Sequence, residues 1–73
     1  MDKGQMETRL MLLQALLEDA TWQKEHLEKR YSEICRRKAP KDMRERYRQD
    51  IERFRCICAN TENEIKDIED MLR

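Results

Sequence analysis

The sequence has few of the residues that form turns and compact cores. Its 73 residues include one glycine, one proline and 5% aromatic residues, whereas 44% are charged. Strands need turn residues and runs of β-branched or aromatic residues, so a β-rich domain is excluded. A core of this size is only marginally stable without a partner, a metal or disulfides. We therefore expect an all-α fold in which residues 1–73 form one domain.

Long apolar runs are also missing. The longest uncharged run, Leu10 to Leu17, has eight residues, whereas a helix needs roughly 20 to cross a bilayer. Acidic residues flank this run on both sides, which does not fit a signal or transit peptide. We expect no membrane insertion and a cytoplasmic location, with the nucleus as the alternative.

Groups for catalysis or metal binding do not cluster along the chain. Nucleophilic catalysis needs a base beside the nucleophile and a third, orienting group, but His26 and Ser32 are the only residues of their kinds. The three cysteines, Cys35, Cys56 and Cys58, contain no C-x-x-C pair. At about 100° per residue, Cys56 and Cys58 point about 200° apart on a helix and cannot bind one metal ion together. We expect neither an enzyme nor a metal or other cofactor.

Apolar residues recur at alternating spacings of four and three, which is the pattern of heptad positions a and d on a helix. Lys24 is the only charged member of either stripe. The first stripe consists of Met6, Leu10, Leu13, Leu17, Ala20, Lys24, Leu27, Tyr31 and Ile34. The second consists of Tyr47, Ile51, Phe54, Cys58, Thr61, Ile65, Ile68 and Leu72. This pattern predicts two long helices, each with one apolar seam.

The two stripes are out of register by one residue, and Pro40 lies at the slip. Proline disfavours helix at the preceding residue and lacks an amide donor, so the first helix should end near Lys38. Asp42 and Glu45 form an Asp-x-x-Glu capping box that can start the second helix. The expected elements are a first helix over about 3–38, a turn near Lys38–Lys41 and a second helix over about 41–72.

The two helices can pair as an antiparallel coiled-coil hairpin. Every a position faces a d position when paired residue numbers add to 78, as in Leu13 with Ile65, and this register puts the turn beside Pro40. The last layer pairs Ile34 with Arg44. No Gly or Asn follows the first helix, which leaves its last carbonyls without the usual left-handed cap. The alternative is a long helix kinked at Pro40 in a coiled-coil dimer.

The first helix is more apolar than a hairpin requires. Seven of the eight residues from Leu10 to Leu17 are apolar, and a helix apolar nearly all round is normally buried nearly all round. We expect a second interface in which two hairpins form a four-helix bundle. The alternative is scattered surface apolar residues without a role. The proposed self-association residues are Leu10, Met11, Leu12, Leu16 and Trp22.

Charge is distributed unevenly although the net charge is zero. Residues 29–55 carry 11 Lys/Arg against five Asp/Glu, and the remaining residues carry five against 11. A hairpin gathers the cations at its tip, where Arg44, Arg46 and Arg48 oppose the dipole at the start of the second helix. The alternative is a solvated tip. The residues proposed to contact an acidic partner are Arg36, Arg37, Lys38, Lys41, Arg44, Arg46 and Arg48.

These features favour a non-enzymatic coiled-coil module for oligomerisation and protein–protein interaction. Such a module fits within a larger cytoplasmic scaffold, cytoskeletal or tethering protein. The expected partners are a second copy of the chain, as a homodimer, and another protein with an acidic or apolar helical surface. The alternative is a polyanion binder that holds nucleic acid or an acidic protein tail at the basic tip, and zero net charge makes nucleic acid the less favoured ligand.

Overall fold

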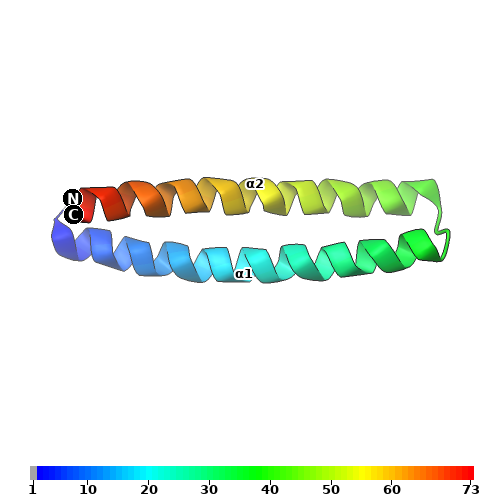
Figure 1. Cartoon of the computed structure of the whole chain (residues 1–73), viewed down its shortest axis with the longest axis horizontal. Coiled ribbons are helices and arrows are strands. Elements are labelled where there is room, and N and C mark those ends of the chain that lie inside the picture. The colour runs from blue at the N-terminus through cyan, green and yellow to red at the C-terminus, as the bar shows by residue number, and fades with distance from the viewer. Residues whose placement is uncertain (1) are drawn as a thin grey trace.

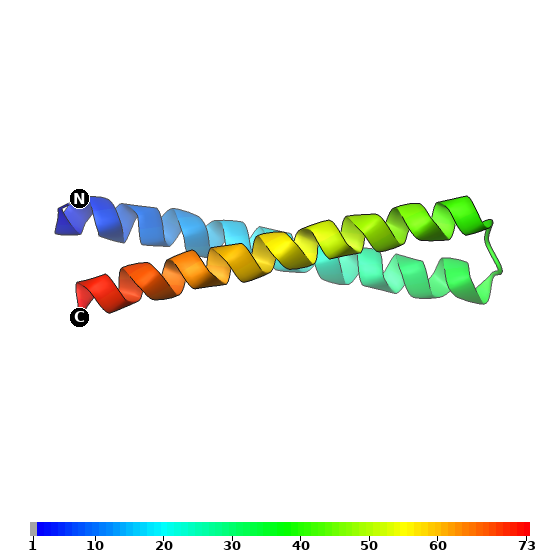
Figure 2. The same ribbon diagram turned by 90° about the horizontal axis from the view of Figure 1, so that it is seen from above.

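The computed structural model describes residues 2–73 as two long helices joined by a short turn (Figure 1). Helix α1 spans Lys3–Arg36 and helix α2 spans Lys41–Leu72. The helices run antiparallel and cross along their length, so both termini lie at one end and the turn lies at the other (Figure 2). The Cα atoms extend over 53 × 14 × 14 Å. This arrangement confirms the hairpin, not the extended kinked rod.

Helix α1 begins with a side-chain cap. Asp2 has extended backbone geometry, and its Oδ1 accepts a hydrogen bond from the backbone amide of Gln5 at 2.8 Å. The carboxylate thereby satisfies one of the amides that have no partner at a helix start, and its charge interacts favourably with the helix dipole. The start of α1 at Lys3 agrees with the expected boundary.

The end of α1 differs from the prediction. The helix ends at Arg36 instead of residue 38, because Lys38 adopts the left-handed conformation with φ 56°. The Lys38 amide donates to the Cys35 carbonyl at 3.2 Å, and the Ala39 amide donates to the Ile34 carbonyl at 2.9 Å. These two bonds make a Schellman motif. The expectation that the last carbonyls lack a left-handed cap was therefore wrong, since a lysine takes the position that glycine usually fills.

The start of α2 also differs. Pro40, with φ −54° and ψ 147°, is the N-cap residue, and no side chain caps this helix end. The Pro40 carbonyl accepts the first helical hydrogen bond, from the Arg44 amide at 3.2 Å. The predicted capping box was wrong, because it requires Asp42 itself at the N-cap and Asp42 lies inside the first turn. There its charge still interacts favourably with the helix dipole.

The two seams face each other. All residues of both predicted stripes are buried or half-buried. The largest apolar cluster contains Leu13, Ile65 and Ile68, with Met6, Leu10, Leu17 and Leu72 packed against it. This cluster agrees with the predicted register. The exception is Arg44, which is exposed and not paired with Ile34 at the seam, because a guanidinium buried without an ionic partner loses its hydration.

The middle of the seam is lined by small side chains. Ala20, Cys58 and Thr61 are 2%, 6% and 5% exposed. Thr61 Oγ1 donates to the Ile57 carbonyl at 2.7 Å, so its hydroxyl is satisfied within α2. The core of the hairpin is therefore bulkiest near the termini. Over residues 2–73, neither helix combines the length and the apolar character that a bilayer-spanning segment needs.

Candidate protein-interaction surfaces

Two ion pairs between the helices define the two sides of the hairpin. Arg9 Nη2 lies 2.9 Å from Glu64 Oε2, and both residues occupy position g, which directly precedes an a position. Arg55 Nη2 lies 3.7 Å from Glu28 Oε2, and both residues occupy position e, which directly follows a d position. Residues at g on the two helices thus share one side of the hairpin, and residues at e share the other. We call these the g side and the e side.

The two sides differ in character. The g side carries Leu16 on α1 and Met43, Ile57 and Met71 on α2. Leu16, Met43 and Met71 are 47%, 47% and 63% exposed, and Ile57 is half-buried. On the e side the described residues are Glu7, Gln14, Thr21, Glu28, Cys35, Arg48, Arg55, Glu62 and Glu69. The e side is thus polar or charged, whereas the g side exposes large apolar side chains from both helices.

One group of these apolar residues lies in the half of the hairpin away from the turn. Leu12, 66% exposed, occupies position c beside the g side, one helical turn before Leu16. Ile57 and Met71 lie at g positions of the antiparallel helix in the same half. We call Leu12, Leu16, Ile57 and Met71 the apolar flank. It is the part of the exposed surface where both helices contribute aliphatic residues to one side.

The structure does not bring all five predicted self-association residues together. Leu10 is half-buried against the core cluster, so it packs within the hairpin. Met11 and Trp22 are 71% and 64% exposed, but their b and f positions point away from the g side. Only Leu12 and Leu16 belong to the apolar flank. Sequence reasoning missed Ile57 and Met71, although the heptad positions of the second stripe already place both of them at g.

Residues that could carry chemistry lie apart from one another. His26 stacks on Trp22 one turn earlier, with ring centroids 5.3 Å apart and planes within 5°. Cys58 is buried in the seam, whereas Cys56 is exposed and Cys35 is half-buried. In the part of the chain that the structure describes, no three His, Cys, Asp or Glu side chains converge as metal ligands would.

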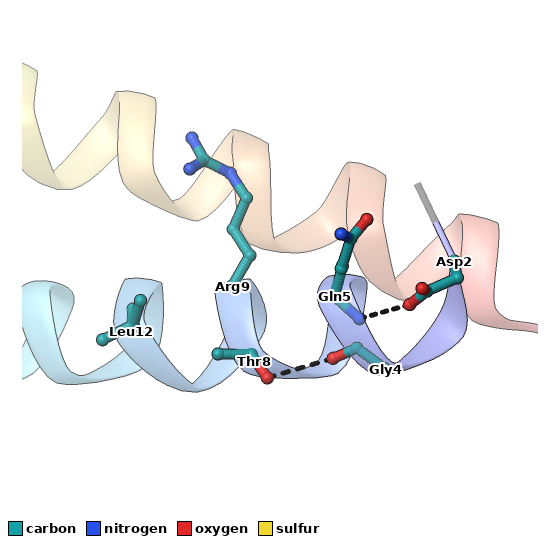
Figure 3. Close-up of a pocket in the computed structure, with 6 residues that line it drawn as sticks. All are labelled: Asp2, Gly4, Gln5, Thr8, Arg9 and Leu12. Atoms are coloured by element: carbon teal, nitrogen blue, oxygen red, sulfur yellow. Dashed lines mark hydrogen bonds between the residues drawn. The ribbon is translucent and has the colours of Figure 1, made fainter.

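A shallow pocket lies over the first turns of α1 (Figure 3). Its polar groups already have partners within the hairpin. Thr8 Oγ1 donates to the Gly4 carbonyl at 3.0 Å, and Asp2 caps the helix. Arg9 extends toward α2, where it forms the ion pair with Glu64. The lining residues are Asp2, Gly4, Gln5, Thr8, Arg9 and Leu12.

The seven cations predicted to form a basic tip lie around the turn, as expected for a hairpin. All seven are exposed. Among residues 2–73, the one ion pair that involves any of them joins Arg48 to Glu45 at 3.9 Å within α2. We call this set the basic tip; it consists of Arg36, Arg37, Lys38, Lys41, Arg44, Arg46 and Arg48.

The side chain of Tyr31 on α1 reports the position of two of these cations. Its side-chain hydrogen bond with Cys35 raises the pKa of Tyr31, while the positive charges of Arg48 and Arg44 act in the opposite direction. Both arginines of α2 therefore lie close to the Tyr31 ring. The cations of α2 and those at the end of α1 form one positively charged surface.

Comparison with known proteins leaves this geometry as the basis for function: no protein family, no curated sequence and no solved structure matches the chain.

Proposed function

We propose that the chain is a non-enzymatic coiled-coil module that self-associates and thereby brings proteins together. Two hairpins pack through their g sides into a four-helix bundle. The observation that carries this proposal is the apolar flank, because Leu12, Leu16 and Met71 are 66%, 47% and 63% exposed beside the half-buried Ile57. Burying such side chains in an interface stabilises it by roughly 1.5–3 kcal/mol for each fully buried residue.

The core of a single hairpin also favours a partner. Its middle layers contain Ala20, Cys58 and Thr61, and Lys24 occupies a seam position. Small and charged residues bury little apolar surface, whereas ordering each backbone residue costs roughly 1–2 kcal/mol. A second hairpin adds apolar burial without lengthening the chain. Self-association therefore supports both the function and the stability of the fold.

The decisive experiment compares two double variants of α1. Leu12→Glu with Leu16→Glu places two charges on the apolar flank and leaves the seam unchanged. Met11→Glu with Gln14→Glu adds the same two charges in the same turns, at b and e positions away from the g side. We expect the first variant to be monomeric in sedimentation equilibrium and the control to keep the oligomer mass. Equal masses for both variants would refute an interface on the g side.

The second candidate function is polyanion binding through the basic tip. It rests on the exposure of seven cations that have one ion pair among them. An oligonucleotide and a polyglutamate peptide are suitable probes, because binding to phosphates weakens steeply with salt. Replacement of Arg44, Arg46 and Arg48 by Glu should abolish binding to both probes. Binding of neither probe to the unmodified chain rules this function out.

A further inference from the structure

We propose that the two hairpins of the dimer lie antiparallel, so that the basic half of each copy runs beside the acidic half of the other. This inference rests on the self-association proposed above and specifies its geometry. The occupant of the apolar flank is a second copy of the chain, and the charge distribution fixes its direction.

The hairpin separates its charges along its long axis. Residues 29–55, which include the turn, carry a net charge of +6, and the other residues carry −6. The structure places the first group in the half that contains the turn and the second group in the half that contains both termini (Figures 1 and 2). Two hairpins aligned in the same direction would superimpose like charges. Two antiparallel hairpins place opposite charges side by side.

The apolar flank is positioned to permit this overlap. Leu16 lies 13 residues after the first residue of α1 and 20 residues before its last, which corresponds to about 20 Å and about 30 Å at about 1.5 Å per residue. A two-fold axis beside Leu16 places Arg30 of one copy level with the start of α1 in the other. Arg48, which lies level with Arg30 on α2, then runs beside the acidic end of the second copy. That end contains Asp2, Asp67, Glu69 and Asp70.

The same off-centre position leaves the turn uncovered. The final 10 Å or so of each basic tip extends past the end of its partner, given about 1.5 Å per residue. Arg36, Arg37 and Lys38 therefore stay accessible at both ends of an elongated dimer. The antiparallel dimer thus has a neutralised centre and two basic ends.

Distances between identical spin labels distinguish the two directions. In a background of Cys35→Ser, Cys56→Ser and Cys58→Ala, a single label is attached after either Gln14→Cys or Ser32→Cys. Both positions are exposed, and helix content and oligomer mass are checked for each variant. Residue 14 lies near the proposed two-fold axis, and residue 32 lies 16 residues from Leu16. Along the axis, labels at 32 are then separated by about 48 Å, and labels at 14 by about 6 Å.

A long distance at residue 32 with a short one at residue 14 supports the antiparallel dimer. Short distances at both positions, within two or three helix diameters or about 20–35 Å, show a same-direction dimer and overturn this inference while keeping self-association. Long distances at both positions overturn it too, since the copies then meet end to end. A monomer mass for the unmodified chain overturns the proposed function itself.

The salt dependence of the unmodified chain gives a second reading that needs no label. The Debye length falls from about 30 Å at 0.01 M to about 3 Å at 1 M. Because sodium chloride screens attraction between opposite halves, the dissociation constant of the antiparallel dimer rises with salt. A dissociation constant that falls with salt shows repulsion between like halves and contradicts the antiparallel arrangement.

Discussion

Replacement of Lys38 by glycine should stabilise the hairpin. Lys38 is the one non-glycine residue with positive φ in the described chain, at 56°. This conformation costs an L-residue roughly 1–2 kcal/mol, and glycine adopts it freely. Glycine also adds about 0.4–1 kcal/mol of conformational entropy to the unfolded state. The difference predicts a gain of about 0.5–1 kcal/mol in the free energy of unfolding.

Urea denaturation followed by circular dichroism, at one fixed protein concentration, measures this gain. A change of about 1 kcal/mol shifts the melting temperature of a small domain by roughly 4–8 °C. Lys38→Ala removes the charge but keeps the β-carbon, so it should leave stability nearly unchanged. Arg37→Gly is the matched control, because Arg37 has φ −81° and does not need glycine. If Lys38→Gly destabilises the chain as much as Arg37→Gly does, the left-handed cap is not the end of α1.

Two further stability predictions use the same assay. Asp2→Ala removes the cap bond to the Gln5 amide and should cost about 1 kcal/mol, whereas Asp42→Ala, which has no such bond to lose, should cost less than half of that; equal losses would contradict the cap assignment. Ile68→Ala should cost about 2–5 kcal/mol, since Ile68 is 5% exposed, whereas Met11→Ala at 71% exposure should change stability by less than about 0.5 kcal/mol; similar effects would contradict the seam.

The seam could be predicted from the sequence because it is encoded twice. Leu13 and Ile65 occur in stripes with the same spacing, and one register both pairs the stripes and places the turn beside Pro40. Burial of apolar side chains enforces this periodicity along the whole helix. The core cluster of Leu13, Ile65 and Ile68 follows directly from it.

The chain ends of the helices were less predictable, because single residues there have alternatives of similar energy. Lys38 is an unusual left-handed residue, and nothing in its side chain indicates that conformation. Asp42 matched a capping box, but the extended geometry of Pro40 starts α2 before it. Boundaries of this kind depend on local backbone geometry, which a side-chain pattern does not record.

The candidate surface was predicted on α1 alone. The dense apolar run drew attention to Leu12 and Leu16, whereas Ile57 and Met71 stand as isolated apolar residues in a charged helix. Their common side appears only when the two helices are placed together, with Arg9 paired to Glu64. The basic tip was predicted in full, because any hairpin with a turn near Pro40 gathers those cations.

Sedimentation equilibrium of the unmodified chain tests the central claim most directly. The chain mass is 9.0 kDa, and a dimer held by the apolar flank has twice this mass and dissociates on dilution. We expect the weight-average mass to fall from the dimer value toward 9.0 kDa across a dilution series. A mass of 9.0 kDa at every concentration, with the helices fully formed by circular dichroism, would contradict self-association.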